Sequence, residues 1–265
     1  MPELPDVQVF KQYVDSTSLH QTIRKIDLRS PELLGDVSAE ELKQHLLDHS
    51  IHASRRHGKY LFLRLDNSAS VVLHFGMTGF PVYFLNQESA PDHIRLLLTF
   101  SSGYYLAYDC RRKLGLIDLA GNEQDFIDSK ELGIDAFSEH FTYKTLKDLL
   151  KNKKGSIKST LMNQKIIAGI GNIYSDEILF QSGIHPKSCA GALDDSRLKH
   201  LYNEIKRVFQ QSIQSLASTR AFPKEFLLPN REPGAECPLC GGNIVKQTIS
   251  SRSSYFCNQH QTDIS

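Results

Sequence analysis

The residues that follow the initiator methionine place an amine and a carboxylate side by side, at Pro2 and Glu3. If Met1 is removed, Pro2 carries a free secondary α-amine, and α-amino groups lose their proton at a much lower pH than lysine side chains do. Such an amine can attack an aldehydic sugar carbon to give an iminium ion, while Glu3 transfers protons as general acid and base. The same residues, followed by Pro5 and Asp6, are also typical of an ordinary helix start. On these residues alone, both interpretations stay open.

Four further side chains with ligand chemistry lie near the C-terminus. They are Cys237, Cys240, Cys257 and His260, in two pairs that are each separated by two residues. The residues between the pairs, 243–256, alternate in character and predict a β-hairpin. This spacing is typical of a tetrahedral structural zinc site, so we predict one bound Zn²⁺. The metal would fold a ribbon that is too small to bury a core of its own.

Basic residues recur where turns are expected. The clusters are 55–59, 111–113 and the lysines at 151, 153, 154, 158 and 165. A single cluster of this kind is typical of a solvated surface, but recurrence in both halves predicts a cation-lined cleft for a polyanion. Arg252, at the expected hairpin tip, would suit a phosphate contact. Since the net charge is only +1, positive charge would have to be concentrated on one surface.

A glycine-containing segment, 168–174, lies between two helical patterns. Gly169 and Gly171 would let backbone amides approach a ligand closely, and the following helix would direct its positive end and Asn172 at a phosphate. A bare Gly-x-Gly is usually only a tight turn. Its position next to lysines favours the phosphate interpretation here.

The elements that must position these groups divide the chain into two halves. Short alternating or β-branched segments predict strands in the first half, at 23–28, 59–65, 71–75, 82–85, 94–100 and 104–108. A helix is expected over 38–47, where Ser38 and Glu41 form a capping box. Beyond about residue 138 the apolar period becomes helical. We predict that the segment 121–133 is a loop between the halves, and that 222–236 is the connection to the terminal ribbon.

Composition indicates an ordinary globular protein of more than one domain. The chain has 265 residues, and no apolar run approaches the roughly 20 residues needed to cross a bilayer. The N-terminus does not have the pattern of a signal peptide. The five cysteines are odd in number and do not form a secreted disulfide framework. We therefore expect a soluble monomer inside the cell, in the cytoplasm or nucleoid, with no membrane partner.

The ordered motifs together resemble the formamidopyrimidine-DNA glycosylase and endonuclease VIII family along the whole chain. The matching segments are 2–5, 58–61, 74–79, 112–115, 157–158, 169–174 with 176–177, and the ribbon with Arg252. The resemblance implies an α+β, multi-domain fold: an N-terminal β-sandwich with flanking helices (residues 1–132), a helical domain with a helix-two-turn-helix element (133–228) and a C-terminal β-hairpin zinc finger (229–265). It also implies damaged DNA as the partner, most simply as a duplex.

Residue roles follow from the same resemblance. Pro2 would attack C1′ of a flipped nucleotide, with Glu3 moving protons, and Lys59, Asn172 and Arg252 would hold the flanking phosphates. Met77, Arg112 and Leu114 match the side chains that fill the void left in the duplex. Lys158 matches a lysine near the lesion. The implied activity is that of a DNA glycosylase and abasic-site lyase that cleaves the backbone by β,δ-elimination.

The substrate and two alternatives remain open in the sequence. Leu114 stands where a Phe is usual, and the segment 218–236 looks short for a loop that covers an extruded purine. We therefore expect endonuclease VIII-like lesions, namely oxidised pyrimidines and hydantoins, with an 8-oxoguanine and formamidopyrimidine enzyme as the alternative. A non-catalytic damaged-DNA-binding zinc-finger protein is an alternative of another class. A zinc-ribbon transcription factor would leave the first 220 or so residues unexplained.

Overall fold

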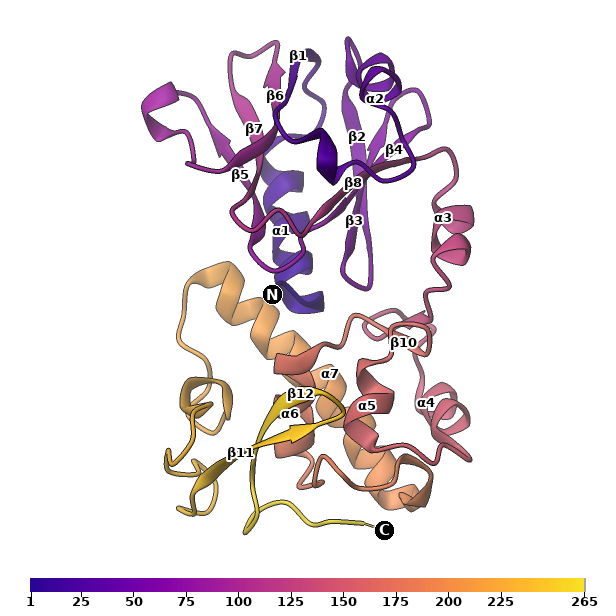
Figure 1. The fold of residues 1–265 in the computed structure, drawn as a ribbon, viewed down its shortest axis with the longest axis vertical. Coiled ribbons are helices and arrows are strands. Elements are labelled where there is room, and N and C mark those ends of the chain that lie inside the picture. The colour runs from indigo at the N-terminus through magenta and orange to yellow at the C-terminus, as the bar shows by residue number, and fades with distance from the viewer. Residues whose placement is uncertain (265) are drawn as a thin grey trace. The chain divides into compact units, whose positions relative to one another are not determined.

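A computed structural model describes residues 1–264 of the chain and divides them into two compact units (Figure 1). Unit 1 comprises Met1–Pro2 and Asp6–Glu131, and unit 2 comprises Glu3–Pro5 and the chain from Leu132 onward. The first helix therefore begins with residues that belong to unit 2. Among the described residues, no helix is both long and apolar enough to cross a membrane.

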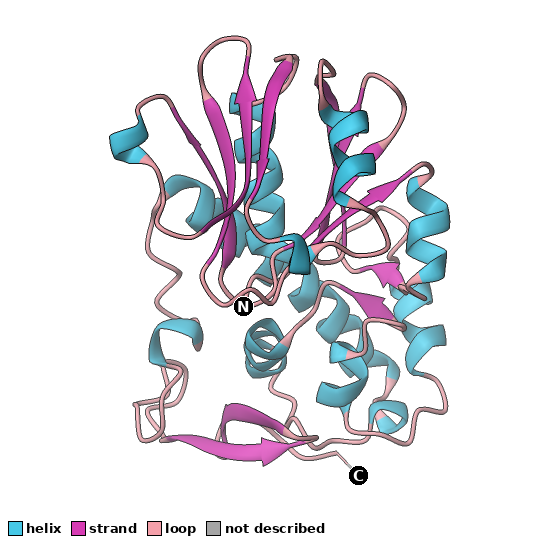
Figure 2. Cartoon of the chain, turned by 45° about the horizontal axis from the view of Figure 1, so that its top comes forward, coloured by secondary structure: helices cyan, strands magenta, loops and turns pink. Residues whose placement is uncertain are grey.

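Unit 1 contains two four-stranded antiparallel sheets, which Figure 2 shows as separate layers of strands. One sheet has the order β1-β6-β7-β5 and the other β2-β3-β4-β8. The strands are β1 (Ile23–Leu28), β2 (Ile51–His57), β3 (Tyr60–Leu65), β4 (Ser70–His74), β5 (Gly79–Phe84), β6 (Ile94–Phe100), β7 (Tyr105–Cys110) and β8 (Leu116–Ala120). Their inward side chains form one apolar core, as expected for a sandwich.

Three helices complete unit 1: α1 (Leu4–Thr17), α2 (Ala39–Leu46) and α3 (Glu123–Ser129). Helix α1 contacts both sheets, because Arg56 of β2 donates to Gln8 at 2.9 Å and Tyr13 is hydrogen-bonded to the Tyr83 backbone of β5. Val7 and Val14, one and three turns into the helix, lie in the sandwich core. Helix α1 is thus fixed by unit 1 beyond its first residues.

Most sequence-predicted elements of unit 1 are present, and three elements of the structure, β2, β8 and α3, were not predicted. The capped helix is confirmed, since Ser38 Oγ accepts from the Glu41 amide at 3.1 Å. Strands β2 and β8 were not predicted, because polar side chains interrupt their alternation. The prediction of a loop over 121–133 was wrong: Asn122 caps α3 by accepting from the amides of Gln124 and Asp125. The basic residues 55–57 likewise lie within β2 and not in a turn.

Unit 2 is mainly helical. Its helices are α4 (Tyr143–Leu150), α5 (Ile157–Met162), α6 (Asn172–Gln181) and α7 (Asp195–Ser218). Two-residue strands β9 (Ile134–Asp135) and β10 (Ile167–Ala168) pair in parallel, and β10 lies in the connection between α5 and α6. The helices share a core to which Leu4, from the beginning of α1, also belongs.

The C-terminal part of unit 2 is a β-hairpin formed by β11 (Ile244–Ile249) and β12 (Arg252–Cys257). Its tight turn places Ser250 and Ser251 in the left-handed region, with φ of 49° and 61°. Three cysteines gather next to the hairpin. The expected α+β fold, with a sandwich, a helical domain and a terminal hairpin, is therefore confirmed.

Candidate functional site

The N-terminal residues differ sharply in exposure. Met1 is 45% exposed, Pro2 is partly buried, and Glu3 is completely buried. An exposed Met1 is accessible to removal, which would free the Pro2 amine. The amine and the carboxylate that sequence analysis singled out therefore have different surroundings.

The Glu3 carboxylate caps helix α6. Its oxygens accept from the amides of Gly171 at 2.8 Å, Ile173 at 2.8 Å and Tyr174 at 3.1 Å. These amides lie at the positive end of a helix, which binds anions well. Sequence analysis had assigned this helix end to a phosphate. In the structure, the anion bound there is the protein's own Glu3.

Gly169 and Gly171 provide the space for the N-terminal residues. A Cβ on Gly171 would lie 2.3 Å from Glu3 Cδ, and one on Gly169 would lie 2.4 Å from Leu4 Cδ1. Gly169 also has a φ of +111°, and its carbonyl accepts from the Leu4 amide at 3.1 Å. The two glycines thus allow the beginning of the chain to pack against the start of α6.

Asn172, the first residue of α6, contacts the hairpin. Its Nδ2 donates to the Ser253 carbonyl at 3.0 Å, while its Oδ1 is buried without a hydrogen-bond partner. Arg252, one residue before Ser253, is exposed. The structure therefore links the two predicted phosphate-binding residues of unit 2, because Asn172 is hydrogen-bonded to the residue that follows Arg252.

Lys158 is buried in an ionic network and not on the surface. Its Nζ lies 2.6 Å from Asp176 Oδ1 and 2.7 Å from Ser254 Oγ, with both charged side chains 1% exposed or less. The other Asp176 oxygen accepts from Arg231 Nη2 at 2.7 Å and Nε at 3.0 Å, and from the Tyr255 amide at 3.2 Å. Burial lowers the pKa of Lys158 and raises that of Asp176, in each case against the attraction of the partner.

The neighbouring acid, Glu177, holds a different segment. Its carboxylate accepts from the amides of Leu227 at 3.2 Å and Leu228 at 2.8 Å, and from Gln181 Nε2 at 2.8 Å. Burial raises the pKa of Glu177 to about 7. Asp176 and Glu177 therefore attach the hairpin and the segment after α7, respectively, to the same helix.

In unit 1, Lys59 follows the left-handed Gly58 in the turn between β2 and β3, and only 7% of its surface is exposed. Burial of His74 lowers the pKa of its imidazole to about 4, and the positive charge of Lys59 acts in the same direction. His74 is therefore a neutral neighbour of Lys59 at physiological pH, and its Nδ1 accepts weakly from the Gly76 amide at 3.3 Å.

The three predicted void-filling residues stand on two adjoining loops of unit 1. The Arg112 amide donates to Thr78 Oγ1 at 3.1 Å, and a Cβ on Gly76 would lie 2.2 Å from the Leu114 carbonyl oxygen. Met77 and Leu114 are 40% and 51% exposed, and Arg112 is also exposed. The structure thus exposes two apolar side chains and one guanidinium on neighbouring loops.

The cysteine pattern forms a cluster. Among the described residues, the Sγ atoms of Cys237, Cys240 and Cys257 lie within 4.8 Å of one another, and those of Cys240 and Cys257 are 3.5 Å apart. His260 is not in this group of mutually close atoms. Its Nε2 lies 2.8 Å from the Phe180 carbonyl oxygen, and its ring packs 4.9 Å from that of Phe180.

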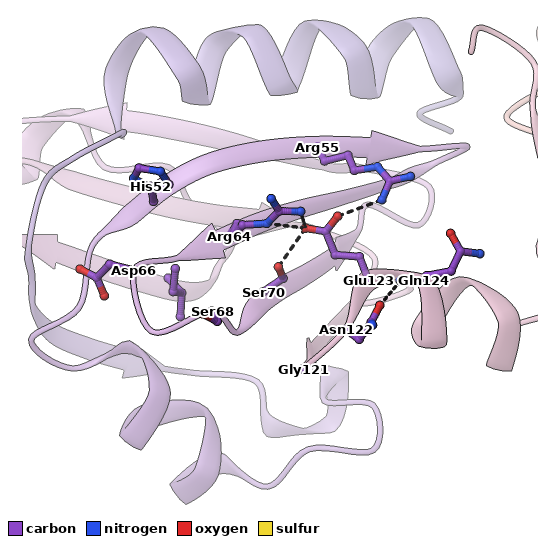
Figure 3. A pocket seen from close by; sticks show the side chains of 11 residues that line it. His52, Arg55, Arg64, Asp66, Ser68, Ser70, Gly121, Asn122, Glu123 and Gln124 are labelled. Atoms are coloured by element: carbon purple, nitrogen blue, oxygen red, sulfur yellow. Dashed lines mark hydrogen bonds and ion pairs between the residues drawn. The ribbon is translucent and has the colours of Figure 1, made fainter. Parts of the chain in front are cut away.

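A separate cavity of about 670 Å³ lies on unit 1, next to the start of α3 (Figure 3). The buried Glu123 carboxylate accepts there from Ser70 at 3.0 Å and pairs with Arg55 and Arg64. None of the predicted site residues lines this cavity. Arg55, Arg64 and Glu123 there attach α3 to the sheet.

Sequence analysis did not assign a role to Asp176 or Arg231. A signal for the first was present, because Asp176 and Glu177 directly precede the apolar run Ile178–Phe180 of helix α6, and buried acids require partners. Nothing in the sequence marks Arg231 as the partner, since 55 residues separate the two.

Comparisons with known proteins identify both halves of the chain. The profile described as the formamidopyrimidine-DNA glycosylase N-terminal domain matches residues 1–117, and the one described as the formamidopyrimidine-DNA glycosylase H2TH domain matches residues 132–223. The formamidopyrimidine-DNA glycosylase of Bacillus subtilis is 33% identical to the chain over 277 residues, which cover 99% of each protein.

Comparison with solved structures identifies the same family. The chain is similar to Lactococcus lactis Fpg in complex with DNA that contains an abasic site, at a TM-score of 0.90 and 26% identity, over 98% of this chain and 100% of that one. It is similar to MutM bound to DNA with a carbocyclic 8-oxo-G, at a TM-score of 0.89 and 28% identity, with the same coverage of the two chains. Another complex of the L. lactis protein contains DNA with an oxidised pyrimidine. Its TM-score is 0.90 and its identity 28%, again over 98% of this chain and 100% of that one. The chain therefore belongs to the formamidopyrimidine-DNA glycosylase family of DNA glycosylases and abasic-site lyases.

Proposed function

We propose that the protein excises oxidised purines, of the 8-oxoguanine and formamidopyrimidine kind, from intracellular DNA and then cleaves the abasic site. The fixed position of Glu3 next to Pro2 carries this proposal. Three amides of α6 hold the carboxylate, so the adjacent amine is attached to a rigid support within a few bonds. Positioning of this kind contributes much of an enzyme's rate enhancement.

The proposed chemistry uses the chain's own groups. After removal of Met1, the Pro2 nitrogen forms a bond to C1′ as the bond between C1′ and the base breaks, and the base leaves with a proton from water. The Glu3 carboxylate takes the proton that the amine loses and passes it to O4′ as the bond between C1′ and O4′ breaks, which opens the sugar and leaves an iminium ion. This ion acidifies the C2′ hydrogen, so its removal expels the 3′ phosphate, and a second elimination expels the 5′ phosphate. Water then hydrolyses the iminium and releases the amine.

A structural zinc ion fits the cysteine cluster. Thiolates around tetrahedral zinc lie about 3.8 Å apart, given Zn–S bonds of about 2.3 Å, and the 3.5 Å between Cys240 and Cys257 is close to this value. We propose Cys237, Cys240, Cys257 and His260 as the ligands. When His260 Nε2–H donates to the Phe180 carbonyl, its Nδ1 lone pair is left for the metal, which is the usual arrangement of a zinc-bound histidine.

The relatives favour purine lesions over the pyrimidines expected from the sequence. The matched relative is a formamidopyrimidine-DNA glycosylase, and one similar structure holds 8-oxo-G. Oxidised pyrimidines remain the second candidate for one reason. The segment from Thr219 to Glu236 is attached to α6 through Glu177, and Phe222 packs on Phe226, so little of it is left to cover an extruded purine.

Borohydride trapping tests the lyase. A duplex with a single abasic site should become covalently attached to the Met1-processed protein, because reduction fixes the iminium. Pro2→Gly should greatly reduce the adduct, and a variant that retains Met1 should abolish it. A processed protein that forms no adduct would rule out the enzyme and leave a damaged-DNA-binding protein.

A lesion panel tests the substrate class. Duplexes that carry 8-oxoguanine, formamidopyrimidine, thymine glycol or 5-hydroxyuracil should be compared by single-turnover kinetics. We expect faster release of the two purine lesions. Faster release of the pyrimidines would overturn this substrate assignment while leaving the lyase intact.

His260→Ala tests the fourth ligand. The variant should contain much less than one zinc per chain, as measured by metal analysis, because three thiolates without the imidazole make an incomplete tetrahedral site. Full zinc content in this variant would remove His260 from the ligand set.

A further inference from the structure

We propose that Asp176 is a positioning residue that fixes Arg252 relative to Glu3 by tying the hairpin to helix α6. The proposal rests on the function proposed above. It assigns Lys158 and Arg231 to the same device, and it concerns contacts within unit 2 alone.

The hairpin is held at three consecutive residues that follow Arg252. The Ser253 carbonyl accepts from Asn172 Nδ2 at 3.0 Å and from Lys158 Nζ at 3.3 Å. Ser254 is completely buried, and its Oγ accepts from Lys158. The Tyr255 amide donates to Asp176 at 3.2 Å. Because Arg252 is covalently joined to the first of these residues, its position depends on them.

Asp176 is the junction of this arrangement. One oxygen holds the ammonium of Lys158 from α5, and the other accepts from Nε and Nη2 of Arg231 and from the hairpin amide. The guanidinium also lies over the Tyr255 ring, 4.4 Å from its centre. Two cations and one hairpin amide thus converge on one carboxylate that is 0% exposed.

Helix α6 connects this junction to the N-terminus. Asn172 and Asp176 are four residues apart and therefore lie on one face of the helix, towards the hairpin. The amides of the first turn of the same helix hold Glu3. A short rigid helix therefore fixes the proposed proton-transfer group at its end and the proposed phosphate-binding arginine at its side. Lys158 acts inside this device, since its side chain is 1% exposed.

A double-mutant cycle tests the proposal. The variants are Asp176→Asn, Arg252→Ala and the combination, and the readout is the affinity for a duplex that contains a tetrahydrofuran abasic-site analogue. We expect each single change to weaken binding about tenfold, and the combination to be no more than about twofold weaker than Arg252→Ala alone, because Asp176 acts through Arg252. Effects that multiply in the combination would overturn the proposal.

Glu177→Gln is the matched control. Glu177 is the next residue of α6 and is equally buried, but it holds the amides of residues 227 and 228 and not the hairpin. Its effect should multiply with that of Arg252→Ala, as expected for a purely structural role. If the Glu177 cycle is as strongly coupled as the Asp176 cycle, the specific link is wrong.

A milder variant covers the case in which Asp176→Asn does not fold, since loss of a buried countercharge can be severely destabilising. Arg231→Met removes the two guanidinium hydrogen bonds to Asp176 but keeps the pair of Lys158 and Asp176. It should show the same lack of additivity with Arg252→Ala, and additivity in this cycle would contradict the proposal.

Borohydride trapping of the unsubstituted protein separates a failure of the proposed function from a failure of the positioning role. No adduct there would refute the proposed function, whereas an adduct together with multiplicative cycles would refute only the positioning role.

Discussion

The loops of unit 1 and helix α6 of unit 2 hold their predicted functional side chains in opposite ways. Met77, Arg112 and Leu114 are exposed, and their loops are joined through backbone groups. Glu3, Lys158 and Asp176 are buried and held by charged hydrogen bonds. Side chains that must enter a partner have to remain accessible, while groups that set a geometry need partners of their own. Substitutions should therefore separate activity from stability in unit 1 but affect both in unit 2.

The largest effect should come from Gly171→Ala. The added Cβ would lie 2.3 Å from Glu3 Cδ, so the carboxylate must move from the amides of α6. We expect base excision to fall by about 100-fold or more, because misplacement of a reacting group by about 1 Å can have such an effect. Single-turnover kinetics would measure the change.

Gly121→Ala is the control, since a Cβ there would meet nothing within 4 Å. It should leave the rate unchanged. A Gly171→Ala variant with the rate of the unsubstituted protein would show that the position of Glu3 is not critical.

The next effect should come from Cys257→Ser. Cys257 is completely buried in the three-cysteine cluster, so its loss should release the proposed zinc and loosen the hairpin that carries Arg252. We expect metal content to fall from one zinc to nearly none, and affinity for abasic-site DNA to fall at least about tenfold. Cys189→Ser, outside the cluster, should change neither quantity. Full retention of zinc by Cys257→Ser would contradict the site.

Met77→Ala and Leu114→Ala test the exposed side of the comparison. Each should slow base release by about tenfold, because it shortens a side chain that is predicted to fill the space of the extruded nucleotide. The free energy of unfolding should change by less than about 0.5 kcal/mol, since both side chains are largely exposed. Leu47→Ala, at a similarly exposed leucine, should alter neither rate nor stability. A large loss of stability in the Met77 or Leu114 variant would remove the contrast between the units.

The pH dependence of stability should have opposite signs in the two units. Burial raises the pKa of Glu177 to about 7, so its folded form favours the neutral acid, and the associated stability is lost as the pH rises from about 4.5 through 7. Burial lowers the pKa of His74 to about 4, so its stability contribution is present above about 6.5 and is lost as the pH falls towards 4. Each contribution is on the order of 3 kcal/mol.

Hydrogen exchange resolved by residue would measure the two contributions separately. Glu177→Gln should flatten the loss of protection in unit 2 as the pH rises from about 4.5 to 7, and His74→Asn should flatten the loss in unit 1 as the pH falls towards 4. If either variant keeps the full pH dependence of the original protein, the titration belongs to another group.

The sequence by itself determined the elements with strong local signals. Strands at 23–28 and 94–100, the Ser38 cap and the hairpin follow from alternation, capping chemistry and turn residues, all of which act over a few positions. The cysteine spacing also predicted that Cys237, Cys240 and Cys257 gather, whereas His260, the fourth predicted ligand, is not among the mutually close atoms. The roles of Pro2, Lys59 and the void-filling residues remain predictions, although the structure places the last group on adjoining loops.

Only the tertiary structure decided what lies at the positive end of α6. A helix N-terminus attracts any anion, and the sequence offered a phosphate, whereas folding brings Glu3 across 168 residues to occupy it. The same holds for the meeting of Lys158, Asp176 and Arg231. A buried charge reveals that it needs a partner, but the partner's identity depends on which distant segments pack against it, and local sequence patterns carry no information on that.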